Sequence, residues 1–278
     1  MKIFYTDLMV ADSESFSPSA HKPREVVQSW QALGIPLEIV APEPVTVEQF
    51  ALAHDRRFVE DVLACRRANG FGNRSAAVAA SLPYTSGSML AAAREAVRNG
   101  RVAVAPCSGF HHATYDTVQG FCTFNGLMVT ACALRVEVVA SRVGILDFDQ
   151  HWGNGTDDIL RQLGADWVRH YSAGAEWDSP KQATRFLDAI PQLVESMADC
   201  GVILYQAGAD PHVDDPLGGW LTLSSCVNEI GWCSRTAQGW VCRSRGILPA
   251  AIKPLCATFW TFTTTRCASA RQCSGDEG

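Results

Sequence analysis

The sequence lacks the features of a membrane, secreted or nucleic-acid-binding protein. No apolar run approaches the ~20 residues that a transmembrane helix needs. The first ten residues include Lys2 and Asp7 and no long apolar core, so they do not form a signal peptide. Acidic residues outnumber basic ones, 29 to 23, and no basic patch alternates with aromatic residues. We therefore expect a cytoplasmic protein with no nucleic-acid partner and no membrane partner.

The cysteines of the first 222 residues also lack the spacing that is typical of zinc sites. Five of the 11 cysteines lie in residues 1–222, and none of these forms a CxxC pair, which argues against a cysteine zinc site there. The other six crowd residues 223–278. Because composition changes at this point, we divide the chain into a domain of residues 1–222 and an aberrant tail of residues 223–278.

Short apolar runs alternate with helical patterns in the first part of the chain, which predicts an α/β fold with a mostly parallel sheet. The expected strands are residues 2–5, 37–40, 101–105, 143–146, 167–171 and 202–206. The expected helices are residues 24–33, one that opens at 46–48, 57–67, 84–98, one from Asn125 to 139, 156–163 and 183–197. Residues 13–23 and 71–80 are expected to be loops.

The stretch of residues 143–156 carries the strongest chemical signal. Its apolar start predicts a buried strand, and Asp147, Asp149 and His151 follow at alternate positions. Side chains two apart in an extended chain point the same way, so two carboxylates and an imidazole leave the strand end together. Such oxygen and nitrogen donors suit zinc or iron. The alternative is that the acids only cap the next helix, although a buried carboxylate without a partner is costly.

Two other expected strands also end in polar side chains. His111 and His112 follow one of them, and Asp210 follows the last. A lone histidine is usually a core residue, whereas an adjacent pair at a strand end favours a functional role. Ligands bind at the carboxyl ends of parallel strands, where these clusters are expected to meet. Asp149, His151 and Asp210 would then supply three ligands and leave a position for water, the pattern of a catalytic metal site.

Four motifs, taken together and in this order, resemble those of the histone deacetylase and acetylpolyamine amidohydrolase superfamily. They are residues 106–113, 120–125, 146–156 and 208–219. The resemblance covers roughly residues 1–222. It implies a three-layer, open, mostly parallel sheet of arginase type, with helices on both faces and one zinc ion at the strand ends.

The resemblance also implies a role for individual residues. By role, these are the zinc ligands Asp149, His151 and Asp210, the catalytic residues His111, His112, Asp147 and Asn154, and the substrate-tunnel wall Gly120 and Phe121. His112 would act as the general base, and Asp147 and Asn154 would stand behind the two histidines. A potassium ion beside the backbone of residues 147–151 is implied as well. The alternative for Phe121 and Phe124 is that both are core residues.

The implied function is zinc-dependent hydrolysis of an N-acetyl amide. The implied substrate is acetyl-lysine, an acetylpolyamine or another small acylated amine. The sequence neither predicts nor excludes a homo-oligomer. One alternative is a ureohydrolase of the same sheet type, which would need two metals and a second set of Asp and His motifs. Another is a metal-binding relic without catalytic activity.

The sequence departs from the family pattern in two places. Residues 170–174 replace an aromatic-Pro-Gly loop of the family. The family's Gly-Gly-Tyr loop after the last metal ligand is also missing, since no tyrosine follows Tyr205. The hydroxyl of that tyrosine would help to stabilise the oxyanion, and losing one such donor costs about 10²–10³ in rate. We therefore expect weak or no activity.

A shifted reading frame explains the tail. If the third base of each codon is read with the first two of the next, residues 245–253 permit Trp-Asn-x-Ala-Gly-Gly-Tyr-Gln, which resembles the missing loop. Residues 225–233 and 259–266 also permit family-like patterns in that frame. Our hypothesis is that one base was lost, in the gene or in its sequencing, just after the codon of Thr222. A poorly ordered or badly packed tail would result. The alternative is a natural divergent tail, and resequencing the locus distinguishes the two.

Overall fold

Parallel strands form the centre of the computed structural model, which describes residues 2–32, 34, 36–107, 109–215, 219–222 and 225. The strands of this part are β1 Lys2–Phe4, β2 Glu38–Val40, β3 Ala103–Val104, β4 Val143–Asp147, β5 Val168–Ser172 and β6 Val202–Gln206. They pair in the orders β2-β1-β3 and β5-β4-β6, and every pairing is parallel. The predicted parallel α/β arrangement is confirmed.

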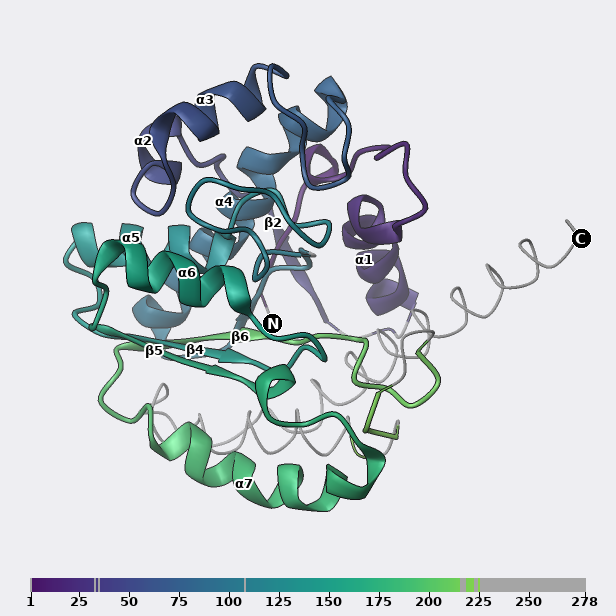
Figure 1. Ribbon diagram of the computed structural model, residues 1–278, viewed down its shortest axis with the longest axis vertical. Helices are drawn as coiled ribbons and strands as arrows, with labels where there is room; N and C mark the ends of the chain where they lie inside the picture. The colour runs from purple at the N-terminus through teal and green to yellow at the C-terminus, as the bar shows by residue number, and fades with distance from the viewer. Residues whose placement is uncertain are drawn as a thin grey trace, which may run out of the picture.

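Helices cover both faces of the strands, as Figure 1 shows for α5 and α6 on one side of β5-β4-β6 and α7 on the other. The helices are α1 Lys22–Ala32, α2 Val47–Phe50, α3 Arg56–Leu63, α4 Ala76–Asn99, α5 Gly126–Val136, α6 Asn154–Leu163 and α7 Ala183–Glu195. Val26, Val27 and Trp30 of α1 pack against Ile3 of β1. The hydroxyl of Ser88 in α4 donates to the carbonyl of Phe4. The predicted three-layer architecture is therefore present.

The central strand β4 packs apolar side chains against the helices on both of its faces. All five of its residues are buried, as expected for a parallel strand covered on both faces. Val143 and Ile145 join the core that contains α5, whereas Leu146 joins the core that contains α7. Asp147 follows Ile145 by two positions, so its side chain points to the layer of α5 and α6.

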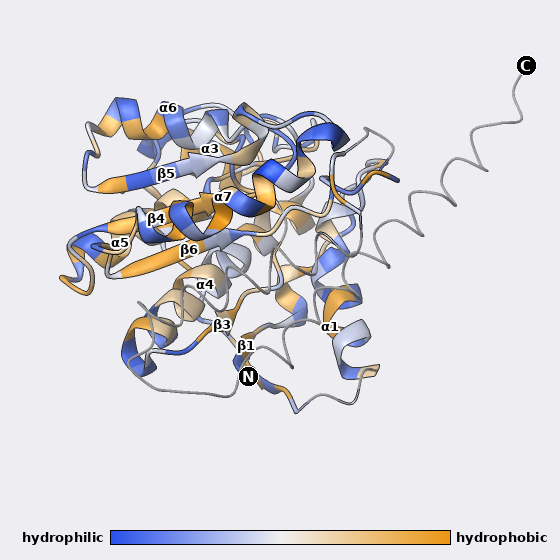
Figure 2. Ribbon diagram, turned by 90° about the horizontal axis from the view of Figure 1, so that it is seen from below, coloured by the Kyte–Doolittle hydropathy of each residue, from blue (hydrophilic) through white to orange (hydrophobic). Residues whose placement is uncertain are grey.

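The edge strand β5 is more polar than its neighbours. Figure 2 shows hydrophobic residues along β6 and hydrophilic ones in the middle of β5. Arg169 in β5 is exposed and its guanidinium lies 2.8 Å from the carboxylate of Asp199. A charged side chain on an edge strand disfavours pairing with another chain.

One predicted loop is wrong. Residues 71–80 were expected to be a loop, but α4 begins at Ala76, because the side chain of Ser75 accepts from the amide of Val78 and caps the helix. Pro83 lies inside α4, where the sequence pattern suggested a boundary. The expected helix that begins at Asn125 is present as α5, and the side-chain oxygen Oδ1 of Asn125 caps it by accepting from the amide of Met128 at 3.1 Å.

The predicted tail of residues 223–278 lies outside the described residues except for Ser225, and so does the prediction that it is poorly packed. Within the part of the chain that the structure describes, no helix is both long enough and apolar enough to cross a membrane.

Candidate active site

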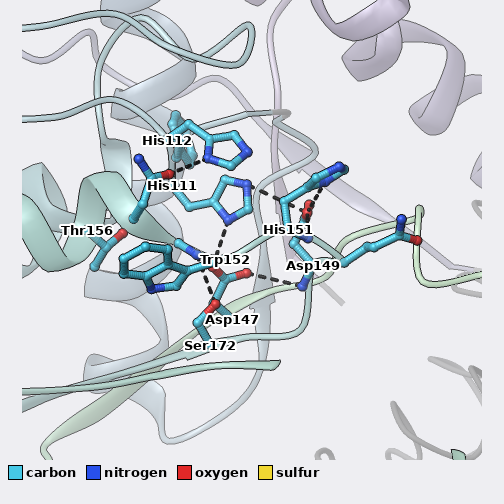
Figure 3. A network of polar contacts seen from close by, with 12 residues as sticks. His111, His112, Asp147, Asp149, His151, Trp152, Thr156 and Ser172 are labelled. Carbon is cyan, nitrogen blue, oxygen red and sulfur yellow. Dashed lines mark hydrogen bonds and ion pairs between the residues drawn. The ribbon is translucent and has the colours of Figure 1, made fainter. Parts of the chain in front are cut away.

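The predicted site residues meet at the carboxyl ends of the strands. His111 and His112 follow β3, Asp147 ends β4, and Asp210 follows β6. Figure 3 shows His111 between His112 and Asp147, with His151 and Asp149 beside it. The convergence expected at the carboxyl ends of the parallel strands is therefore present in the structure.

The candidate metal group consists of Asp149, His151 and Asp210. One ligand atom from each lies within 4.8 Å of the other two, and no second group of this kind occurs among the described residues. His151 Nδ1 lies 2.7 Å from Asp210 Oδ2 and 3.2 Å from Asp149 Oδ1. The structure thus brings together the three residues that the sequence suggested as ligands.

Backbone contacts fix the positions of this group. A Cβ atom on Gly174 would lie 2.3 Å from the carbonyl carbon of His151, so only glycine fits at this position. The amide of Gln150 donates to Asp210 Oδ1 at 3.1 Å, and the amide of His151 donates to Asp149 Oδ1 at 3.0 Å. Each carboxylate is therefore oriented by a main-chain donor as well as by the imidazole.

The two carboxylates of the group perturb each other. Burial, and then the charge of Asp149, raises the pKa of Asp210 to about 6. Burial opposes ionisation of Asp149 too, but the charge of His111 and the hydrogen bond from His151 hold the pKa of that carboxyl well below its usual range. Two crowded carboxylates and an imidazole, half-buried beyond the strand ends, fit a divalent cation, and zinc accepts this set of nitrogen and oxygen donors.

Each of the tandem histidines has a polar partner behind it. His111 Nδ1 donates to Asp147 Oδ2 at 2.7 Å, and His112 Nδ1 donates to Asn154 Oδ1 at 2.6 Å. Asn154 Nδ2 in turn donates to Gln119 Oε1 at 2.8 Å, which orients the amide so that its oxygen faces the imidazole. In both rings the Nδ1 position is thereby occupied. His111 Nε2 faces Asp149 Oδ1 at 3.6 Å, whereas Nε2 of His112 is left for chemistry.

The environments of the two histidines differ. Burial opposes protonation of His111, but the charges of Asp147 and Asp149 raise its pKa to about 9. Burial, and then the neighbouring charge of His111, lowers the pKa of His112. The ring centroids are 4.1 Å apart. The pKa values of the two neighbouring imidazoles are therefore shifted in opposite directions, upward for His111 and downward for His112.

Of the two predicted wall residues, Gly120 lies directly beside His112. Gly120 has φ +54°, and a Cβ there would lie 2.4 Å from His112 Cδ2. Phe121 has φ +60° and a side chain that is 37% exposed, so it is not a core residue. Phe124 is only 2% exposed, and for this residue the core interpretation is confirmed.

Several residues that support the site were missed in the sequence. Ser172 lies opposite Asp147 in the β4–β5 register, and its hydroxyl accepts from the amide of Gly153 at 2.9 Å. The amide of Thr156 donates to the carbonyl of His111 at 3.1 Å, which ties α6 to the histidine pair. Aligning the carboxyl ends of the expected strands would have found Ser172.

A buried histidine, His54, fixes the loop that follows the pair. Its Nε2 accepts from the amide of Asn125 at 2.9 Å, and its Nδ1 donates to the carbonyl of Thr114 at 2.9 Å. Burial lowers the pKa of His54 to about 4. The ring is therefore a neutral structural link between α5 and this loop.

Comparison with known proteins identifies similar chains. A family model described as the histone deacetylase domain matches residues 18–173. The chain is 49% identical over 160 residues to acetylpolyamine amidohydrolase 2 of Pseudomonas aeruginosa, covering 44% of this chain and 45% of the relative. It is 27% identical over 170 residues to human histone deacetylase 9, covering 48% of this chain and 16% of the relative. The chain thus spans less than half the length of these relatives.

The fold also has a solved counterpart. The crystal structure of the HDA15 HD domain superposes with a TM-score of 0.70 at 16% identity, over 95% of this chain and 88% of that chain. At this identity the likeness concerns the fold alone.

Proposed function

The chain belongs to the histone deacetylase and acetylpolyamine amidohydrolase superfamily, and from this premise we propose that it is a zinc-dependent hydrolase of N-acetylated amines. The substrate is acetyl-lysine, an acetylpolyamine or another small acylated amine. One observation carries the proposal, namely that the ligand atoms of Asp149, His151 and Asp210 converge within 4.8 Å beside two histidines with polar partners.

The metal proposal uses residues whose chemistry fits zinc. Asp149, His151 and Asp210 would hold the ion, and the donor set of two carboxylates and one imidazole is of the catalytic type. A bound zinc ion supplies Lewis acidity to an amide carbonyl and to water. The potassium ion that the family resemblance implies stays a prediction.

Proton transfer is assigned to His112. Its lowered pKa keeps the ring neutral, and its Nδ1–H is held by Asn154, so Nε2 accepts a proton from water and returns it to the departing amine. Asp147 holds His111 as a cation, whose charge favours the anionic transition state of amide hydrolysis.

A metal-binding relic is the second candidate. It is favoured by the absence of any tyrosine after Tyr205, because the oxyanion would lack that hydroxyl donor. The histidine pair, with both partners in place, favours the enzyme. A ureohydrolase is less well supported, since the described residues contain a single three-donor group where two metals would be needed.

The test compares this chain with a version in which the reading frame after Thr222 is restored. Bound zinc is measured by mass spectrometry, and turnover is measured with a fluorogenic acetyl-lysine substrate. We expect zinc in both chains and turnover about 10²–10³ faster in the restored one. Zinc without turnover in either chain would favour the relic, and absence of zinc from both would refute the proposal.

A further inference from the structure

Gln119 contacts the candidate site from the loop before Gly120, although it is not one of the predicted site residues. Its side-chain oxygen Oε1 accepts from Asn154 Nδ2 at 2.8 Å, and Asn154 Oδ1 accepts from His112 Nδ1 at 2.6 Å. The three side chains form a hydrogen-bonded row that runs from the exposed residue Gln119 to the imidazole of His112. The row therefore ends on the ring to which proton transfer is assigned.

A side-chain amide behind an imidazole can be oriented in two ways. The two ends of the Asn154 amide have nearly the same shape, but the oxygen accepts hydrogen bonds and the nitrogen donates them. With the oxygen on His112, the neutral ring has its proton on Nδ1, and Nε2 can accept a proton. With the nitrogen on His112, the proton of the neutral ring moves to Nε2, and the ring can no longer act as a base at that atom.

The neighbouring histidine does not depend on such an orientation. The group behind His111 is the carboxylate of Asp147, and both oxygens of an ionised carboxylate only accept hydrogen bonds. Among the described residues, the side chain of Asn154 forms hydrogen bonds with His112 and Gln119. His112 can adapt to either end of the amide by moving its proton, so Gln119 is the partner that sets the orientation.

Close packing fixes the spacing between the amide and the imidazole. A Cβ on Gly120 would lie 2.4 Å from His112 Cδ2, and a Cβ on Gly155 would lie 2.4 Å from the carbonyl carbon of His112. The ring and the start of α6, where Asn154 lies, are therefore held against each other. The main chain of Gln119 is also fixed, because it exchanges hydrogen bonds of 3.1 and 2.8 Å with Cys122. A turn of the Asn154 amide would then change the tautomer of His112 without changing the spacing.

We propose that Gln119 is a positioning residue whose side-chain oxygen holds the Asn154 amide in the orientation that leaves Nε2 of His112 free to accept a proton. This inference rests on the proposed function, in which His112 is the base, and it adds a residue to the proton-transfer machinery. A side chain at position 119 that only accepts hydrogen bonds should preserve the tautomer of His112. A side chain that only donates them should reverse it.

The test compares Gln119→Glu with Gln119→Lys in the full-length chain supplied with zinc. A carboxylate only accepts and an ammonium only donates, so the two variants should favour opposite orientations of Asn154. The tautomer of the neutral His112 ring is measured by ¹⁵N NMR, because protonated and unprotonated imidazole nitrogens resonate at well-separated shifts. The His112 signals are assigned by their loss in His112→Gln. We expect the proton on Nδ1 in the wild type and in Gln119→Glu, and mainly on Nε2 in Gln119→Lys.

Turnover of the fluorogenic acetyl-lysine substrate by the frame-restored chain gives a second measurement. A hydrogen bond to a charged group shifts an equilibrium of this kind by about 10–100-fold, so Gln119→Lys should lower kcat by that factor. KM should change by less than about twofold, because the substrate does not contact the amide. Gln119→Glu should keep kcat close to the wild-type value.

Two matched variants control for the added charge. Thr117→Glu and Thr117→Lys place the same charges at an exposed position two residues away, where the hydroxyl donates to Asp116 and not to the site. They should leave the tautomer of His112 unchanged. The same tautomer in Gln119→Glu and Gln119→Lys would overturn this inference alone, and so would equal responses at positions 117 and 119. A tautomer that follows position 119, without hydrolysis by any chain, would instead refute the proposed function.

Discussion

Acidification should destabilise the domain through His54. This ring is 1% exposed, accepts from the amide of Asn125 and donates to Thr114. A proton on Nε2 would break the bond to Asn125 and place a charge in the core. Burial accordingly lowers the pKa of His54 from 6.5 to about 4 in the folded chain.

The sign and size of the effect follow from linkage. Between pH 6.5 and 4 the unfolded chain binds a proton at His54 that the folded chain does not bind, so stability falls as pH falls. The contribution is negligible above pH 7, reaches about 2 kcal/mol of lost stability at pH 5, and approaches about 3.4 kcal/mol below pH 4.

Urea unfolding of the wild type and His54→Gln, measured from pH 7.5 to pH 5, checks this expectation. Glutamine removes the titration, so the difference in unfolding free energy between the two proteins should shrink by about 2 kcal/mol over the range. The other titratable groups are the same in both proteins, so their contributions to the pH dependence cancel in the difference. The variant His21→Gln, at a partly exposed side chain, controls for loss of a histidine elsewhere. A difference that stays constant with pH would refute the reasoning.

Three substitutions test the rest of the framework. Gly174→Ala should push the backbone of His151 and weaken zinc binding about 10–100-fold in competition with a chromophoric chelator, and unchanged affinity would contradict the described contact. Gly120→Ala should lower the free energy of unfolding by about 1–3 kcal/mol through backbone strain and the clash with His112, and urea denaturation with no shift would argue against it. Ser75→Ala removes the N-cap of α4 and should lower the free energy of unfolding, measured by thermal denaturation, by about 1 kcal/mol. An unchanged free energy would indicate that α4 does not begin at Ala76.

The strands were predictable because their signals are local. Residues 202–206 were expected as a strand and form β6, and β4 begins at Val143 as expected. The start of α4 was not predictable from periodicity, because Pro83 and a polar stretch hide a helix whose first turn depends on the cap at Ser75.

The candidate metal group was predictable because its signal lies in the types and spacing of its residues. Asp149, His151 and Asp210 do converge in the structure. Their roles stay predictions. The supporting contacts were harder to predict. Aligning the strand ends points to Ser172, but its hydrogen bond with the amide of Gly153 and the close approach of Gly174 to His151 follow only from the packing.

The candidate site draws its residues from the ends of β3, β4 and β6, and β3 belongs to a different sheet from the other two. An ion held by Asp149, His151 and Asp210 would join the segments that follow β4 and β6, which are far apart in the chain. Because a ligand that binds only the folded state adds its binding free energy to stability, the lifetime of the protein in a cell would follow the supply of zinc. Proteases would then remove the metal-free form first.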